Sequence, residues 1–135
     1  MRYLLDTNIC IEIICRKSPE LLARLVALPV GEAGVSAITA AELWASVQKS
    51  RDPARNAEAL AMFLLPLEVA AFDYAAAEAY GRVRAQLEDA GAPIGPLDTL
   101  IAGHALSLAA ILVTNNAAEF GRVAGLRVED WLTRP

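Results

Sequence analysis

The chain begins with the stretch Met1-Arg2-Tyr3-Leu4-Leu5-Asp6-Thr7-Asn8, a short apolar run that ends abruptly in a carboxylate. A run this short and this apolar favours a buried strand of a parallel sheet, because a stable helix needs more residues. In an open α/β sheet, ligands bind beyond the carboxyl ends of the strands. Asp6 is therefore placed for binding or catalysis, and we expect later segments to bring further carboxylates to the same edge.

Apolar runs alternate with helix-like segments along the rest of the chain. After the strand at residues 2–5, further strands are predicted at 33–36, 67–69, 111–113 and 126–128. Helices are predicted over 9–14, 19–28, 39–49, 53–65, 74–90 and 97–108. This alternation implies an α/β fold with a doubly wound, mostly parallel sheet of four to five strands flanked by helices in three layers. With no repeat or linker in the sequence, we expect a single domain over residues 1–135.

Polar residues before several apolar-periodic segments predict where the helices start. Asn8, Ser18 and Asp73 are expected to be N-caps. Thr39 followed by Glu42 fits a capping box, in which the glutamate reaches back to the backbone N–H of the cap.

Composition narrows the class of protein. Hydrophobic residues make up 56% of the chain, which argues against disorder. A net charge of −4 is not that of a general nucleic-acid binder, although divalent cations can reverse the sign of an acidic pocket. No apolar segment reaches the length of a membrane span, and Asp6 interrupts any signal peptide, so we expect a cytoplasmic protein. Cys10 and Cys15 are expected to be buried apolar residues, not disulfide partners or zinc ligands.

Four acidic residues follow strands or lie in the first turns of helices: Asp6, Glu42, Asp98 and Glu119. Each has an ordinary explanation as a helix cap, a partner of the helix dipole or a surface residue. Together, carboxylates at one edge need a counter-charge, and oxygen-rich sites of this kind suit Mg²⁺ or Mn²⁺. Two such ions can hold a phosphodiester and generate hydroxide. His104, the single histidine, is expected to be structural.

Five segments resemble the signature segments of the PIN-domain family, and more narrowly those of VapC toxins from bacterial toxin–antitoxin pairs. They are Leu4-Leu5-Asp6-Thr7-Asn8, Thr39-Ala40-Ala41-Glu42-Leu43, Gly95-Pro96-Leu97-Asp98-Thr99-Leu100-Ile101-Ala102, Val113-Thr114-Asn115-Asn116-Ala117-Ala118-Glu119-Phe120 and Gly125-Leu126-Arg127-Val128-Glu129-Asp130-Trp131. The similarity extends over residues 1–131, and the set is specific because the segments occur in this order and spacing.

The resemblance implies a Mg²⁺-dependent endoribonuclease, with Mn²⁺ as a substitute, that acts on RNA, including initiator transfer RNA. It implies that Asp6 and Asp98 hold the principal ion and that Glu42 and Glu119 complete the catalytic pocket. Many relatives carry Asp near position 116, where this chain has Asn116, so Glu119 is expected to be the fourth acid and Asn116 a polar support. Further supporting polar residues are expected at Thr7, Asn8, Thr99 and Asn115.

The resemblance also implies a VapB-type antitoxin as partner, and a homodimer within a larger toxin–antitoxin complex, with no membrane association. Apolar residues at 9–14 and 21–28 and around Trp44, Met62 and Phe63 are expected to form either a groove for an amphipathic antitoxin helix or simply core. The basic residues Arg16, Lys17, Lys49, Arg51 and Arg55 either contact the RNA backbone or are solvated helix ends. Glu12 either points to solvent or meets a basic group of a partner.

Two alternatives to a nuclease stay open at this point. One is a non-catalytic interaction module with the same fold and no metal. The other is a phosphatase of the haloacid-dehalogenase type, which also uses an Asp after its first strand. That family needs a second Asp two residues further on, where this chain has Asn8.

Overall fold

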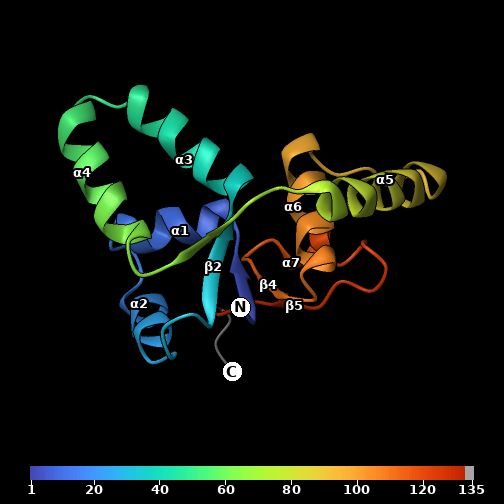
Figure 1. The fold of residues 1–135 in the computed structure, drawn as a ribbon, viewed down its shortest axis with the longest axis horizontal. Coiled ribbons are helices and arrows are strands. Elements are labelled where there is room, and N and C mark those ends of the chain that lie inside the picture. The colour runs from blue at the N-terminus through green and yellow to red at the C-terminus, as the bar shows by residue number, and fades with distance from the viewer. Residues whose placement is uncertain (133–135) are drawn as a thin grey trace.

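Five short strands form one sheet, and all neighbouring strands in it are parallel (Figure 1). The computed structural model describes residues 1–132. The strands are β1 (Tyr3–Leu5), β2 (Ala33–Ser36), β3 (Glu68–Ala70), β4 (Ile111–Val113) and β5 (Val128–Glu129). Their order in the sheet is β3-β2-β1-β4-β5, so the first strand of the chain lies at the centre. The predicted doubly wound parallel sheet is confirmed. The single-domain assignment for residues 1–135 stays a prediction, and its last three residues lie outside the described part.

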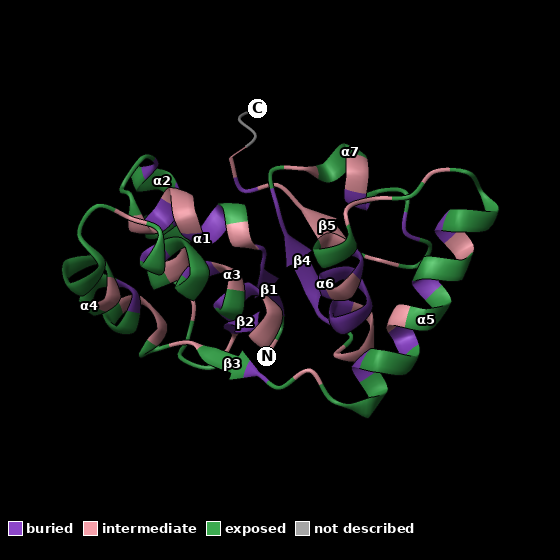
Figure 2. Ribbon diagram, turned by 90° about the horizontal axis from the view of Figure 1, so that it is seen from above, coloured by how far each residue is buried: buried purple, intermediate pink, exposed green. Residues whose placement is uncertain are grey.

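Seven helices of the described residues cover the two faces of the sheet (Figure 1). They are α1 (Thr7–Ile14), α2 (Pro19–Val26), α3 (Ala37–Gln48), α4 (Pro53–Leu64), α5 (Tyr74–Asp89), α6 (Pro96–Ser107) and α7 (Ala117–Phe120). Helices α1 to α4 gather on one side of the molecule and α5 to α7 on the other, with buried strands between them (Figure 2).

Side chains on the central strands alternate between two cores, as the pleat of a strand requires. Tyr3 and Leu5 pack in the cluster with α1 to α4, whereas Leu4 packs in the cluster with α5 and α6. Leu4 pairs with Leu112 in the neighbouring strand, and both are fully buried. A strand buried on both faces explains why β1 has no polar residue before Asp6.

Two predicted helix starts are wrong. Asp6, not Asn8, caps α1, because its Oδ1 accepts a hydrogen bond of 2.9 Å from the backbone N–H of Ile9. Ser36, not Thr39, caps α3, with its Oγ 3.0 Å from the backbone N of Ile38. Thr39 therefore lies inside the helix, and the capping-box explanation of Glu42 fails. In contrast, the caps at Ser18 and Asp73 are confirmed.

Other local predictions also need correction. Cys10 is fully buried as expected, but Cys15 is exposed at the end of α1. The last strand lies at Val128–Glu129, not at residues 126–128. The four-residue helix α7 was not predicted, because so short a helix has no apolar periodicity to reveal it. Within residues 1–132, no helix is both long enough and apolar enough to span a membrane.

Candidate active site

Asp6 lies at the carboxyl end of the central strand and is 3% exposed. Besides the bond from the N–H of Ile9, its Oδ2 accepts a short hydrogen bond from the Thr114 hydroxyl, at the end of β4. Burial raises the pKa of Asp6, whereas these hydrogen bonds oppose the rise because they stabilise the carboxylate. The parallel pairing of β1 with β4 places Thr114 beside Asp6, although the two residues lie far apart in the sequence.

Glu42 projects from α3 toward the first turn of α1. The Thr7 hydroxyl donates a 2.7 Å hydrogen bond to Glu42 Oε1, and Thr7 Oγ1 lies 3.2 Å from Thr39 Oγ1. Thr7 immediately follows Asp6, so this contact brings the second carboxylate to the edge that carries the first. The negative charge of Glu42 contributes to raising the pKa of Asp6.

Asp98 lies in the first turn of α6 and is partly buried. Burial, followed by the negative charges of Glu119, Asp6 and Glu42, raises its pKa from 3.8 to about 6. The carboxyl of Asp98 is therefore close enough to those of Glu119, Asp6 and Glu42 to interact with each of them. The four predicted acids therefore converge, although they come from four different segments of the chain.

Glu119 joins α7 to the loop that precedes Asp98. Its Oε1 accepts a 3.3 Å hydrogen bond from the backbone N–H of Gly95, and its Oε2 accepts a short hydrogen bond from the Asn116 side chain. The backbone N–H of Asn116 in turn donates to Thr114 Oγ1 at 3.0 Å. Thr114 and Asn116 thus form a chain of hydrogen bonds from Asp6 to Glu119.

The donor set of this edge suits a hard divalent cation, since it consists of carboxylate oxygens with hydroxyls behind them. None of the four carboxylates forms an ion pair with a Lys or Arg within residues 1–132. Their repulsion is therefore not balanced by a basic side chain among the described residues, and it adds to burial in raising the pKa of Asp98. In the part of the chain that the structure describes, no three acidic, His or Cys side chains already stand in a closed metal-binding group. The residues fit a metal held partly through water, as Mg²⁺ commonly is.

The side chains of the supporting polar residues predicted at Asn8, Asn115 and Thr99 make no hydrogen bond to the four carboxylates among the contacts of the described residues. Asn8 and Asn115 are exposed. The Thr99 hydroxyl donates to the backbone O of Gly95 at 2.8 Å, so its bond is to its own helix and not to a carboxylate. Sequence reasoning gave no role to Thr114, which is completely buried against Asp6. A hydroxyl directly after an apolar strand was the signal that could have identified it.

His104 lies in the interior, where it joins α6 to Ser36 at the end of β2. It is 1% exposed, its Nδ1 lies 2.8 Å from Ser36 Oγ, and its ring packs edge-on against Phe72. Burial lowers its pKa. Its Nε2 has no hydrogen-bond partner among the described residues. These contacts fit the structural role expected from the sequence.

Comparison with known proteins assigns this geometry to a family. The model of the PIN domain matches residues 3–126. The chain therefore belongs to the PIN-domain family, which confirms the resemblance seen in the sequence.

The chain is similar over almost its whole length to individual members of that family. It is 44% identical to the tRNA(fMet)-specific endonuclease VapC of Shigella flexneri, over 97% of this chain and 98% of that one. The crystal structure of DNA-bound VapBC from Salmonella typhimurium superposes with a TM-score of 0.93 at 41% identity, covering 97% of this chain and 98% of that one. The VapBC2 structure from Rickettsia felis, bound to a promoter DNA fragment, gives 0.92 at 39% identity, covering 97% and 99%.

Proposed function

We propose that this protein is a divalent-metal-dependent endoribonuclease and the toxin of a toxin–antitoxin pair. The observation that carries the proposal is the convergence of Asp6, Glu42, Asp98 and Glu119 at the carboxyl edge of a PIN-domain sheet, with no basic partner among residues 1–132. Full-length similarity to named VapC ribonucleases supports the reaction class. It also argues against the phosphatase alternative, for which the second Asp is missing at Asn8.

The four acids take different roles in this proposal. Asp6 and Asp98 hold the principal ion, and Glu42 and Glu119 complete its surroundings through water or a second ion. Thr114 orients the buried Asp6 through its hydrogen bond and opposes the rise in the pKa of Asp6 that burial causes, and Thr7 orients Glu42. Asn116 holds Glu119 toward the Gly95 loop.

The bound cation would polarise the scissile phosphate and lower the pKa of an attacking water. PIN-domain nucleases use a divalent metal, and we propose Mg²⁺ for this chain, with Mn²⁺ as a substitute, because the site offers only oxygen donors. Since a protonated carboxyl cannot bind a cation well, the raised pKa of Asp98 predicts weaker metal binding below about pH 6.

We propose transfer RNA, including the initiator species, as the substrate. The support is the printed specificity of the Shigella flexneri and Salmonella typhimurium relatives, which are 44% and 42% identical to this chain. We also propose that the protein works in the cytoplasm, as a homodimer within the complex that it forms with its antitoxin.

The test is cleavage of purified RNA by the wild-type protein beside Asp6→Asn and Asp98→Asn. We expect cleavage of initiator transfer RNA with Mg²⁺ or Mn²⁺, none with EDTA, and a loss of at least about a hundredfold in each variant. Glu68→Gln, on the exposed strand β3, is the matched control and should keep full activity. Undiminished cleavage by either Asn variant would remove that residue from the site, and absence of cleavage by the wild type would favour a non-catalytic module.

An apolar groove between α2 and α4 is the proposed binding surface for the antitoxin. Leu22 and Val26 from α2, together with Met62 and Phe63 from α4, line a hollow of about 400 Å³. Val26 and Met62 are 71% and 67% exposed, which is unusual for large apolar side chains without a partner. Ile9, Cys10, Ile13 and Leu21, which were also predicted for this role, are buried in the core instead.

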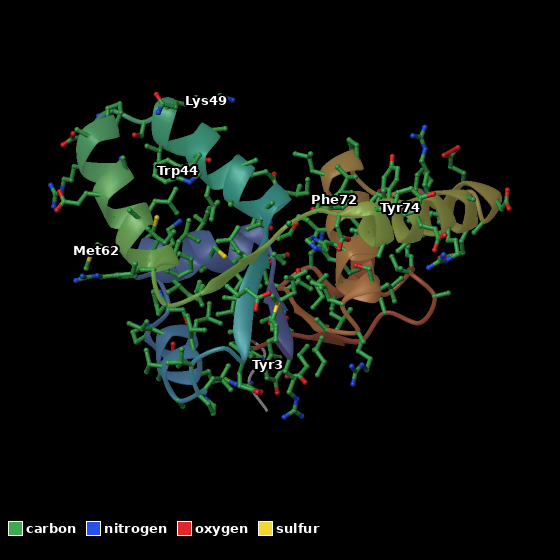
Figure 3. The ribbon with its side chains drawn as sticks, viewed as in Figure 1. Tyr3, Trp44, Lys49, Met62, Phe72 and Tyr74 are labelled. Atoms are coloured by element: carbon green, nitrogen blue, oxygen red, sulfur yellow. The ribbon has the colours of Figure 1, made fainter. Side chains whose placement is uncertain are left out.

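An amphipathic helix fits such a groove, and the solved relatives from Salmonella typhimurium and Rickettsia felis are VapBC complexes. We expect Met62→Glu to lose co-purification with a VapB-type protein encoded beside this gene. Tyr74→Glu is the control, because Tyr74 is 85% exposed but lies on α5, across the molecule from Met62 (Figure 3). Equal retention of the antitoxin by both variants would place its binding surface elsewhere.

A further inference from the structure

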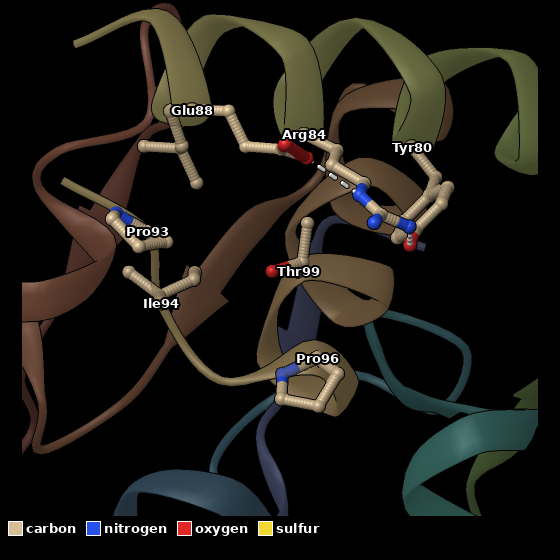
Figure 4. A pocket seen from close by; sticks show the side chains of 8 residues that line it. Tyr80, Arg84, Glu88, Pro93, Ile94, Pro96 and Thr99 are labelled. Atoms are coloured by element: carbon tan, nitrogen blue, oxygen red, sulfur yellow. Dashed lines mark hydrogen bonds and ion pairs between the residues drawn. The ribbon is translucent and has the colours of Figure 1, made fainter. Parts of the chain in front are cut away.

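A second pocket lies between α5 and α6, immediately beside the turn that carries Asp98 (Figure 4). Its volume is about 380 Å³, within the range of pockets that bind small organic groups. On one side are residues of α5, and on the other are Ile94, Pro96 and Thr99. Asp98 stands between Pro96 and Thr99 in the sequence, so this α5–α6 pocket begins within one helical turn of the candidate active site.

The α5 side of the pocket is held in place by a close contact between the two helices. A methyl group at Gly103 would lie only 2.7 Å from the backbone N and Cα of Tyr80, so α5 and α6 touch backbone to backbone there. Tyr80 also lines the pocket. Because Asp98 lies on the same helix as Gly103, this contact fixes the aromatic side of the pocket relative to the carboxylates.

The pocket is lined by one basic side chain, Arg84, and one acidic side chain, Glu88, which form an ion pair. Arg84 is 62% exposed, and its guanidinium donates to Glu88 Oε1 at 2.7 Å and to the Tyr80 hydroxyl at 3.1 Å (Figure 4). These bonds leave further N–H donors of Arg84 free for an anion. Arg122 donates to the backbone O of Pro93, at the other side of the same loop, at 3.2 Å. Arg84 therefore keeps N–H donors for a phosphate oxygen that neither Glu88 nor Tyr80 occupies.

We propose that the α5–α6 pocket is a nucleotide-binding subsite for RNA, in which Arg84 binds a backbone phosphate and a base packs against Tyr80 and the apolar wall. This inference rests on the proposed function, because it assigns the pocket to a nucleotide next to the one that is cleaved. A guanidinium beside an aromatic ring is a combination that binds single-stranded RNA without requiring one particular base.

Two arginines of α5 provide a matched pair for the test. Arg82 and Arg84 are 68% and 62% exposed, and each forms an ion pair with a glutamate four residues away, but only Arg84 lines the pocket. Binding of a fluorescein-labelled single-stranded RNA is measured by anisotropy, with Ca²⁺ in place of Mg²⁺ to suppress hydrolysis. We expect Arg84→Gln to weaken binding roughly threefold or more and to reduce the slope of log K against log salt concentration by about 0.7, the value for one lost phosphate contact. Arg82→Gln should bind as the wild type does.

The aromatic part of the proposal is tested at Tyr80. Tyr80→Leu keeps an apolar side chain but removes the ring, and we expect roughly tenfold weaker binding, whereas Tyr80→Phe should bind nearly as the wild type does. With an RNA that carries abasic positions, the Tyr80→Leu effect should disappear while the Arg84→Gln effect remains. Thermal unfolding of each variant shows whether a loss of binding reflects a loss of folded protein.

The binding assay separates this proposal from the proposed nuclease activity. Equal binding by Arg84→Gln and Arg82→Gln would overturn the subsite, even if the wild type cleaves RNA. Weaker binding by Arg84→Gln and Tyr80→Leu alone would support the subsite, even if no cleavage is detected. In a cleavage assay, the same variants should raise KM and leave kcat unchanged, because the pocket binds substrate without touching the reacting phosphate.

Discussion

Replacing Asp98 with Asn should stabilise the metal-free protein while it destroys metal-dependent activity. The carboxyl of Asp98 has its pKa raised from 3.8 to about 6 by burial and by the charges of Glu119, Asp6 and Glu42. Its ionised form is therefore unfavourable in the folded chain when no cation is bound. An asparagine keeps the shape and removes that charge.

The size of the effect follows from the pKa. A rise from 3.8 to about 6 corresponds to about 3 kcal/mol of folding free energy. Asp98 is only partly buried, so water screens part of the repulsion, and we expect about 1–2 kcal/mol. Because the folded state holds the proton more tightly than the unfolded state, the penalty develops between about pH 4 and pH 6 and is complete above it. Asp98→Asn should therefore be nearly neutral at pH 4 and stabilising at pH 7.5.

The assay is urea unfolding with EDTA at both pH values, for the wild type, Asp98→Asn and the surface control Glu68→Gln. Added Mg²⁺ or Mn²⁺ should raise the midpoint of the wild type and leave that of Asp98→Asn almost unchanged, since only a folded site binds the ion. Destabilisation by Asp98→Asn at pH 7.5 in EDTA would refute the reasoning, because it would show that the carboxylate contributes to the fold.

Three further predictions concern the groups around this carboxylate. Thr114→Val removes the hydrogen bond to Asp6, so the free energy of unfolding at pH 7 should fall by about 1–3 kcal/mol and the pKa of Asp6 should rise further. An unchanged acid limb in the pH profile of cleavage would contradict this prediction. Glu119→Gln removes the charge that contributes most to the raised pKa of Asp98, so a carboxyl NMR titration should show a lower pKa for Asp98. An unchanged value would argue against an interaction between the two carboxylates. Gly103→Ala places a methyl group 2.7 Å from the backbone of α5 and should destabilise the fold by about 1–3 kcal/mol, as measured by thermal unfolding. Gly81→Ala is the control, because a methyl group at Gly81 would meet no atom within 4 Å.

The sequence predicted those parts of the fold that depend on neighbouring residues. Apolar runs identified β1 and β4, and the polar residues Ser18 and Asp73 marked two helix starts correctly. It also singled out all four acids, because carboxylates at strand and helix ends stand out against an apolar background. The local sequence pattern gave the wrong start for α3, because Thr39 and Glu42 have the spacing of a capping box whereas Ser36 is the N-cap.

By itself, then, the amino-acid sequence determined the alternation of strands and helices and singled out the acids that we propose as the active site. The tertiary structure decided that β1 lies between β2 and β4, which places Asp6 beside Thr114 and within reach of the charges of Glu42 on α3 and Asp98 on α6. The packing of α5 against α6 also formed the α5–α6 pocket, and the end of α1 left Cys15 exposed to solvent. The physical reason is range: strand order and helix crossing depend on contacts between residues far apart in the chain, which local periodicity and capping preferences do not encode.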